Sequence, residues 1–276
     1  MDAWNEPSRV IAAPDGTPIA VFTSGSGPAL VLIHGTTGDH TTFRVVRPLL
    51  EPRFTLHAID RRGRGASGDR EAYAIEREFE DVAAVAEWAA AEAGGPVVLV
   101  GHSYGGRAAL GAARTTGSIH AVVCYEGAPA PPGSTYHPDR IEDRLRERLG
   151  AGDREGAHAL FMREVVGMSE ADLERYRADP VWPARVAAAH TILRELEAET
   201  APAASLESLG AVRQPVLQLL GGESLAVFRE ATLALDARLV DGRVVVIDGA
   251  RHAAHHTHPE AFVAAVERFV SGLPAS

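Results

Sequence analysis

Cysteine, basic residues and long apolar runs are all scarce in this sequence, and each shortage excludes a class of protein. The single cysteine, Cys124, excludes a disulfide within the chain, fits a reducing compartment and lies in an apolar run as a buried, inert thiol would. Lysine and arginine number 27 against 37 acidic residues, and this formal net charge of -10 argues against a nucleic-acid partner. No apolar run approaches the length of about 18 residues that a membrane span needs, and the opening "MDAWNEPSRV" lacks the basic and apolar regions of a signal peptide. We therefore expect a cytoplasmic protein without a membrane partner.

The composition and the pattern of apolar residues indicate a globular protein of alternating strands and helices. Of 276 residues, 46% are apolar and 23% are charged, which suits one large domain with an insertion or two small domains. A helical pattern covers residues 75–93, and the turn "GSGP" suggests that the first two strands are neighbours. The remaining runs are continuous and apolar, as in parallel strands that are covered on both faces. The predicted strands are residues 18–24, 29–35, 53–60, 97–101, 121–126, 215–221 and 243–249. This order predicts a doubly wound α/β sheet.

One long segment interrupts this alternation. Between about residues 129 and 205 the strand pattern disappears, and charged amphipathic helices such as "PDRIEDRLRERLG" replace it. We interpret residues 129–205 as a helical cap inserted after the sixth strand into a core of residues 1–128 and 206–276. We expect the cap to lie over the carboxyl ends of the strands, where ligands bind in open α/β sheets.

The clearest chemical motif is "VVLVGHSYGG", in which Gly101, Ser103 and Gly105 form G-x-S-x-G between an apolar strand and a helical run. A turn of this kind projects the serine hydroxyl, and the glycines on either side remove side chains that would collide. We interpret Ser103 as a nucleophile rather than as a helix N-cap. A serine hydroxyl needs a base with a pKa near 7, which points to a histidine.

Together with three further motifs, the serine turn resembles the α/β-hydrolase family over nearly the whole chain. The motifs are "HGTTG" (34–38), "DRRGRGAS" (60–67), "GHSYGG" (101–106) and "GARHAAHHTHPE" (249–260). The resemblance implies a mostly parallel eight-stranded sheet, a catalytic His252 after the last strand, and an oxyanion hole formed by the backbone N–H groups of Thr36 and Tyr104. It also gives the "DRRGRGAS" loop a structural role, and it leaves His34 either ordering the oxyanion loop or simply packed.

The acid that should orient the histidine departs from the common family pattern. In many members it is an aspartate after the penultimate strand, but here "LLGGESLAVF" holds Ser224 at that place, with Glu223 just before it. Some relatives, including certain haloalkane dehalogenases, carry the acid after the preceding strand, where this chain has Glu126. We predict Glu126 as the acid and keep Glu223 as the alternative. A third possibility is that Glu126 only caps the loop into the insertion.

Several alternatives stay open at this point. The histidines of "HAAHHTH" could bind a metal, but zinc needs converging ligands, and one base with three neighbours explains them better, so we expect no metal or cofactor. The main functional prediction is a serine hydrolase that cleaves an ester, thioester or lactone of a small hydrophobic substrate. A C–C bond hydrolase, a perhydrolase-like enzyme or a non-catalytic small-molecule receptor would share these motifs. A homodimer is left open. The candidate substrate-pocket residues are His34, Phe161, Met162 and Trp182.

Overall fold

The computed structural model describes residues 4–274, which form a sheet of eight strands covered by helices on both faces. The order across the sheet is β1-β2-β4-β3-β5-β6-β7-β8. The strands are β1 (Arg9–Ala12), β2 (Pro18–Gly25), β3 (Ala29–Ile33), β4 (Thr55–Ile59), β5 (Val97–His102), β6 (Ile119–Tyr125), β7 (Val216–Gly221) and β8 (Gly242–Ile247). The pairs β1–β2 and β2–β4 are antiparallel, and the other pairs are parallel. The predicted doubly wound, mostly parallel sheet is confirmed.

The structure differs from the sequence prediction at the edges of this sheet. Strand β1 was missed because it has four residues, of which three are exposed, so it has no apolar run. Strands β2 and β3 are not neighbours, because β4 lies between them and pairs with both. The turn at Gly25 and Gly27 crosses the start of β4 instead of closing a hairpin, and a Cβ atom at Gly27 would lie 2.3 Å from the carbonyl oxygen of Arg53. Strand β8 is a partly exposed edge strand rather than a strand covered on both faces.

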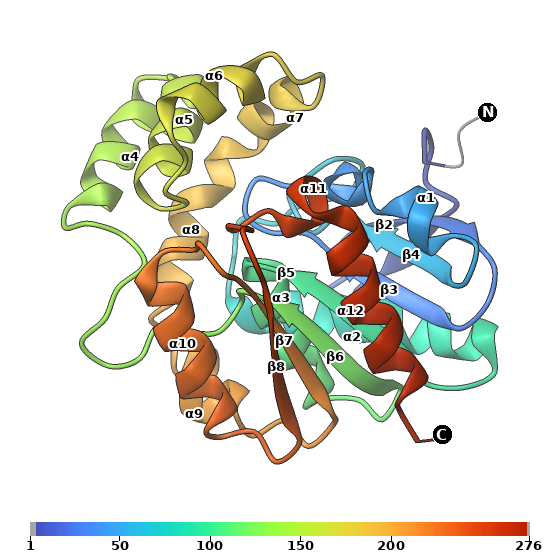
Figure 1. Cartoon of the computed structure of the whole chain (residues 1–276). Helices are drawn as coiled ribbons and strands as arrows, with labels where there is room; N and C mark the ends of the chain where they lie inside the picture. Colours follow the sequence, from blue (N-terminus) through green and yellow to red (C-terminus); the bar gives the residue numbers. More distant parts are fainter. Residues whose placement is uncertain (1–3, 275–276) are drawn as a thin grey trace.

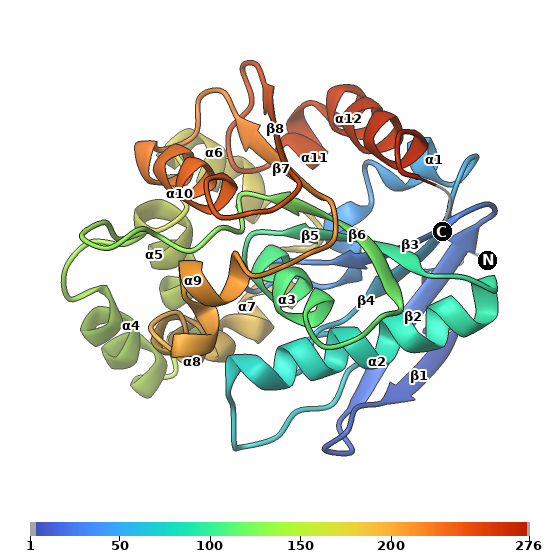
Figure 2. The same cartoon turned by 90° about the horizontal axis from the view of Figure 1, so that it is seen from below.

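The two faces of the sheet are buried by separate sets of helices. Alternate residues of a strand point to opposite faces, so Val31 packs in one core cluster while Leu30 and Leu32 pack in the other. Helices α2 (Ile75–Ala93), α3 (Tyr104–Ala113), α9 (Leu206–Leu209) and α10 (Ala226–Asp236) cover the first face, and α1 (Arg47–Leu50) and α12 (Pro259–Ser271) cover the second. Figure 2 shows α2 and α12 on opposite sides of the sheet. Within residues 4–274, no helix combines the length and the hydropathy needed to cross a membrane.

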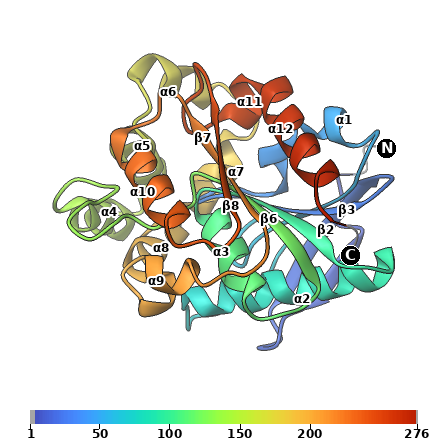
Figure 3. The ribbon, with the colours of Figure 1, turned by 60° about the horizontal axis from the view of Figure 1, so that its bottom comes forward.

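Between β6 and β7 the chain forms a helical layer of its own. Helices α4 (Ile141–Gly150), α5 (Arg154–Glu164), α6 (Glu170–Arg177), α7 (Trp182–Ala187) and α8 (Ile192–Ala198) make up this layer. It stands apart from the sheet in Figure 1, and in Figure 3 its helices α4 and α5 lie on the same side of the molecule as α10. The layer has its own apolar core, which includes Leu145, Leu160 and Ile192. The short helix at Pro202–Ala204 already packs on α2 and α3, so the chain has returned to the core by that point.

Buried ion pairs fasten this helical layer to the sheet domain. Arg61 and Arg64, from the "DRRGRGAS" loop, both donate to Glu195 of α8, and all three side chains are buried. Arg61 also pairs with Glu78 of α2 at 2.8 Å. Because a buried charge is costly unless it is paired, these residues depend on one another. The loop therefore has the structural role that the sequence predicted.

Candidate active site

Ser103 lies in a sharp turn between β5 and α3. Its backbone angles, φ 54° and ψ -125°, are unusual for a residue with a side chain and are held by the packing around the turn. A Cβ atom at Gly101 would lie 2.5 Å from the carbonyl oxygen of Gly105, and one at Gly105 would lie 2.3 Å from that of Ile33. Only glycine fits either site, so the spacing of the motif follows from the close approach of β3, β5 and α3.

His252 lies in the loop between β8 and α11 (Ala254–Thr257), and three contacts hold that loop. The Tyr125 hydroxyl donates to the carbonyl oxygen of Arg251 and accepts a hydrogen bond of 2.9 Å from the N–H of Ala254. Nε2 of His102 donates to the carbonyl oxygen of His252 at 2.8 Å. Burial lowers the pKa of His102 well below its usual value, so this ring is neutral and its Nδ1 carries no proton. The ring of Phe228 stacks on His252 with 4.4 Å between centroids.

Glu126 directly follows β6 and carries a buried carboxylate in contact with His252. Its positive φ of 46° turns the side chain out of the strand direction, and the residue is only 3% exposed. Oε2 accepts a hydrogen bond of 2.5 Å from Nδ1 of His252. Oε1 accepts from the N–H of Gly221 at 2.7 Å and from the Ser224 hydroxyl at 2.5 Å. The carboxylate is thus fully hydrogen-bonded, which is what a buried charge requires.

These contacts distinguish the two candidate acids. Glu223 is exposed, and its backbone N–H donates to the carbonyl oxygen of Ala250 at 2.8 Å, whereas its carboxylate has no hydrogen-bond partner within residues 4–274. Ser224, at the place where many family members carry the acid, instead donates to Glu126. A carboxylate that accepts from Nδ1 assigns the proton to that nitrogen, which leaves Nε2 of His252 free to act as a base.

Two backbone N–H groups close to Ser103 have no hydrogen-bond partner among the residues that the structure describes. Across residues 4–274, neither Thr36 N nor Tyr104 N donates a hydrogen bond. Tyr104 is the first residue of α3, where the helix leaves its N–H groups unpaired and places partial positive charge. Thr36 follows Gly35, at which a Cβ atom would lie 3.0 Å from the Cβ of Ser103. The "HGTTG" loop therefore passes close to Ser103.

His34 lies beneath this loop rather than in a substrate pocket. Its Nδ1 donates to the carbonyl oxygen of Gly35 at 2.8 Å, and its Nε2 accepts from the N–H of Arg61 at 3.0 Å. Burial first, and then the charge of Arg61, hold the pKa of His34 well below its usual value. The neutral ring therefore ties the "HGTTG" loop to the "DRRGRGAS" loop, which corrects its assignment as a pocket residue.

A cavity of about 400 Å³ lies between the sheet domain and the helical layer, and Ser103 and His252 line it. Its apolar wall comes from the helical layer and includes Phe161 and Met162, as predicted from the sequence. Trp182 does not line it. This ring packs inside the layer against His158 and Tyr176, with 4.7 Å and 5.3 Å between centroids. A second, smaller chamber of about 30 Å³ adjoins Ser103, Tyr104 and Phe228.

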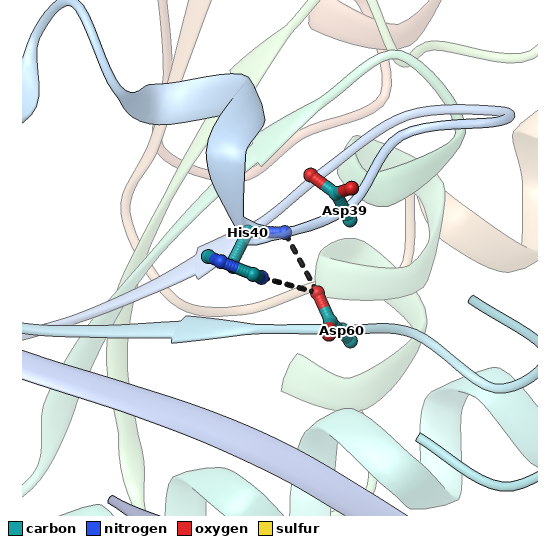
Figure 4. Close-up of side chains that lie close together, drawn as sticks. All are labelled: Asp39, His40 and Asp60. Carbon is teal, nitrogen blue, oxygen red and sulfur yellow. Dashed lines mark hydrogen bonds and ion pairs between the residues drawn. The ribbon is translucent and has the colours of Figure 1, made fainter. Parts of the chain in front are cut away.

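The other histidines of the "HAAHHTH" segment do not form a metal cluster with His252. Burial lowers the pKa of His255 well below its usual value and that of His256 to about 4. In the part of the chain that the structure describes, the only cluster of side chains that could hold a metal ion is Asp39, His40 and Asp60, shown in Figure 4. Both of its carboxylates already have partners in the protein. Oδ1 of Asp60 accepts from both N and Nδ1 of His40 at 2.8 Å, and Asp39 pairs with Arg185 at 2.7 Å. The group holds loops together.

The fold and this site can be compared with known proteins. The sequence model described as "Alpha/beta hydrolase family" matches residues 30–265. The chain belongs to the alpha/beta hydrolase family. It is 31% identical to the 2-(acetamidomethylene)succinate hydrolase of Mesorhizobium japonicum over 91% of this chain and 90% of that protein. It is 29% identical to the pimeloyl-[acyl-carrier protein] methyl ester esterase of Xanthomonas campestris over 91% of this chain and 98% of that protein.

A solved structure of this alpha/beta hydrolase family shows the same fold. The crystal structure of an alpha/beta hydrolase from Sphaerobacter thermophilus has a TM-score of 0.76 and 31% identity, and covers 92% of this chain and 100% of that one. The named relatives are hydrolases, which supports hydrolase activity without fixing a substrate.

Proposed function

We propose that this alpha/beta hydrolase is a serine hydrolase that cleaves an ester, thioester or lactone through an acyl-enzyme. The contact that carries the proposal is the 2.5 Å hydrogen bond from Nδ1 of His252 to Oε2 of Glu126, beside a cavity that Ser103 also lines. This bond sets the tautomer that a base needs, and the strained turn presents the serine. An esterase among the relatives is consistent with ester cleavage.

The first half of the reaction forms the acyl-enzyme. Nε2 of His252 takes the proton of the Ser103 hydroxyl while Oγ attacks the carbonyl carbon, and the negative charge moves to the carbonyl oxygen. The free N–H groups of Thr36 and Tyr104 stabilise that oxygen, and removing one such donor typically costs about 3 kcal/mol. When the intermediate collapses, the carbon–oxygen or carbon–sulfur bond breaks, and the leaving alcohol or thiol receives the proton from His252.

The second half returns the enzyme to its starting state. His252 takes a proton from a water molecule, whose oxygen attacks the acyl carbon, and the same two N–H groups hold the second intermediate. The bond to Oγ then breaks, His252 returns the proton to Ser103, and the carboxylic acid leaves. Throughout, the Glu126 carboxylate stabilises the imidazolium and stays ionised.

A panel of p-nitrophenyl esters and a fluorophosphonate probe test this proposal on the purified protein. We expect the probe to label Ser103, and we expect Ser103→Ala to leave less than ~1% of the hydrolysis because a triad without its nucleophile collapses. Thermal melting should be unchanged, since the change removes only Oγ. The exposed Ser26 provides the matched control, and Ser26→Ala should keep full activity. Full labelling of Ser103→Ala would show that another residue is the nucleophile.

A further inference from the structure

The end of the cavity formed by η1 (His40–Phe43), α6 and α7 is rich in positive charge. The charged side chains that line the cavity are Arg44, Arg175, Asp179 and Arg185. Three guanidinium groups thus face the cavity together with one carboxylate. Asp39, which pairs with Arg185 at 2.7 Å, and Asp172, which pairs with Arg175, do not line it. The side chains that line the cavity therefore carry more positive than negative charge, although each of the three arginines is paired with an aspartate.

Two of these arginines keep hydrogen-bond donors free. A guanidinium has five N–H groups. Arg44 uses NH2 to pair with Asp179 at 2.5 Å and makes only a long NH1 contact of 3.4 Å to the carbonyl oxygen of Thr41, and its side chain is 34% exposed. The side chain of Arg175 is 77% exposed and pairs with Asp172 through NH2 alone. Arg185 is buried, pairs with Asp39 at 2.7 Å and donates to the Thr41 hydroxyl at 2.9 Å, so its charge lies behind the two more exposed arginines.

The charges of Arg44 and Arg185 also act on a neighbouring side chain, His256. His256 lines this cavity, and its pKa is lowered to about 4, first by burial and then by the charges of Arg44 and Arg185. Asp179 acts in the opposite direction but does not cancel them. The ring is therefore neutral at pH 7 and adds no charge to the cavity.

We infer that Arg44 and Arg175, with the buried charge of Arg185 behind them, bind a carboxylate carried by the substrate. The inference rests on the proposed function, because it places the scissile carbonyl at Ser103 and the anionic group at the far end of the same cavity. Phe161, Met162 and Val166 line the cavity as well and provide an apolar wall for the intervening carbon chain. The substrate class is then a half-ester, or the corresponding thioester, of a dicarboxylic acid. This class adds a carboxylate to the small hydrophobic substrate that the sequence predicted.

Matched pairs of esters test the subsite. The monomethyl esters of succinic, glutaric and adipic acid are compared with methyl butanoate, pentanoate and hexanoate, in which a methyl group replaces the carboxylate. We expect kcat/KM to favour at least one anionic ester by about 10- to 100-fold, which is the usual contribution of a charge-assisted hydrogen bond. Most of the difference should be in KM, and it should shrink in high salt because the cavity is open to solvent on the Arg175 side.

Two variants should shift this preference in opposite directions. Arg44→Met should lower the anionic-to-neutral ratio by about tenfold, whereas Asp179→Asn should raise it, because it frees Arg44 from its partner. A merely structural role in fastening the helical layer would lower activity on both esters in both variants and leave the ratio unchanged. Arg163→Met provides the control, since Arg163 pairs with Glu170 on the surface and does not line the cavity.

A binding measurement separates this inference from the proposed function. Glutarate should bind to Ser103→Ala in isothermal titration calorimetry, and adding Arg44→Met should weaken its Kd by about tenfold. Ester hydrolysis with equal kcat/KM for both members of every pair would overturn the carboxylate subsite and keep the serine hydrolase. Arg44-dependent glutarate binding without hydrolysis of any ester would overturn the serine hydrolase and keep the subsite.

Discussion

Replacing Glu126 by glutamine changes one atom and should abolish most of the activity. The amide oxygen can still accept from the Gly221 N–H and the Ser224 hydroxyl, so the fold should be retained. The amide nitrogen is a donor, and it would face Nδ1 of His252, where Oε2 now accepts a bond of 2.5 Å. The ring must then present a lone pair at Nδ1, which moves its proton to Nε2. In that tautomer His252 cannot take the proton of Ser103.

The size of the effect follows from this change of tautomer together with the lost charge. The same acid-to-amide change in a serine protease triad lowers kcat about 10⁴-fold, which corresponds to roughly 5.5 kcal/mol in the activation barrier. We expect Glu126→Gln to lower kcat at least ~100-fold, because the carboxylate here is buried and makes a short bond to the ring. The free energy of unfolding should change by less than about 1 kcal/mol, since an acceptor remains for both of the other donors.

Steady-state kinetics on p-nitrophenyl acetate, with denaturant unfolding of the same samples, measure both quantities. The matched control is Glu223→Gln, which makes the same chemical change at an exposed carboxylate and should alter kcat less than about twofold. A fully active Glu126→Gln beside an inactive Glu223→Gln would refute the assignment of the acid. It would also show that the loop after β7 rearranges when substrate binds.

Two further predictions concern stability. Glu195→Ala should lower the free energy of unfolding in urea by about 3–5 kcal/mol, because it leaves the buried Arg61 and Arg64 with Glu78 as their only carboxylate partner. The control is Glu197→Ala, at an exposed site on the same helix, which should lower it by less than about 0.5 kcal/mol. Equal losses in the two variants would contradict this network. Burial lowers the pKa of His158 to about 3, and neither of its ring nitrogens has a partner among the described residues, so protonation favours the unfolded chain below about pH 6.5. The stability that depends on the neutral ring is complete above that pH and falls by about 1.4 kcal/mol per pH unit on acidification. Wild type should therefore lose about 2 kcal/mol more than His158→Leu between pH 7 and pH 5, and parallel losses would disprove the point.

Strand positions could be predicted where the burial of a strand is visible in its own residues. The central strands are covered on both faces, so continuous apolar runs marked them. The edge strands β1 and β8 are partly exposed, and the pattern there was absent or misleading. The order of the strands is set by pairing between distant segments, and for this reason a short turn between β2 and β3 suggested a neighbour relation that β4 interrupts.

The cavity was the part of the site least visible in the sequence. Its charged end combines Arg44 from the sheet domain with Arg175 and Arg185 from the helical layer, and the pair Arg44–Asp179 joins residues 135 positions apart. Each of these residues lies in an ordinary charged segment, with no local pattern that distinguishes it from the surface. Trp182, in contrast, looked like a pocket residue because it is a large aromatic side chain, but it is used in the packing of the helical layer.

The sequence by itself determined the nucleophile, the histidine and the oxyanion loop as candidates, because their chemistry depends on short segments that end a strand or begin a helix. Only the tertiary structure shows which of the two candidate acids, Glu126 or Glu223, contacts His252. The contact with Glu126 depends on its positive φ and on the proximity of three separate segments, β6, β7 and the His252 loop, around one carboxylate. The cavity and its charge were likewise decided by the docking of the helical layer, since a pocket wall is made by side chains that meet only after distant segments have packed together.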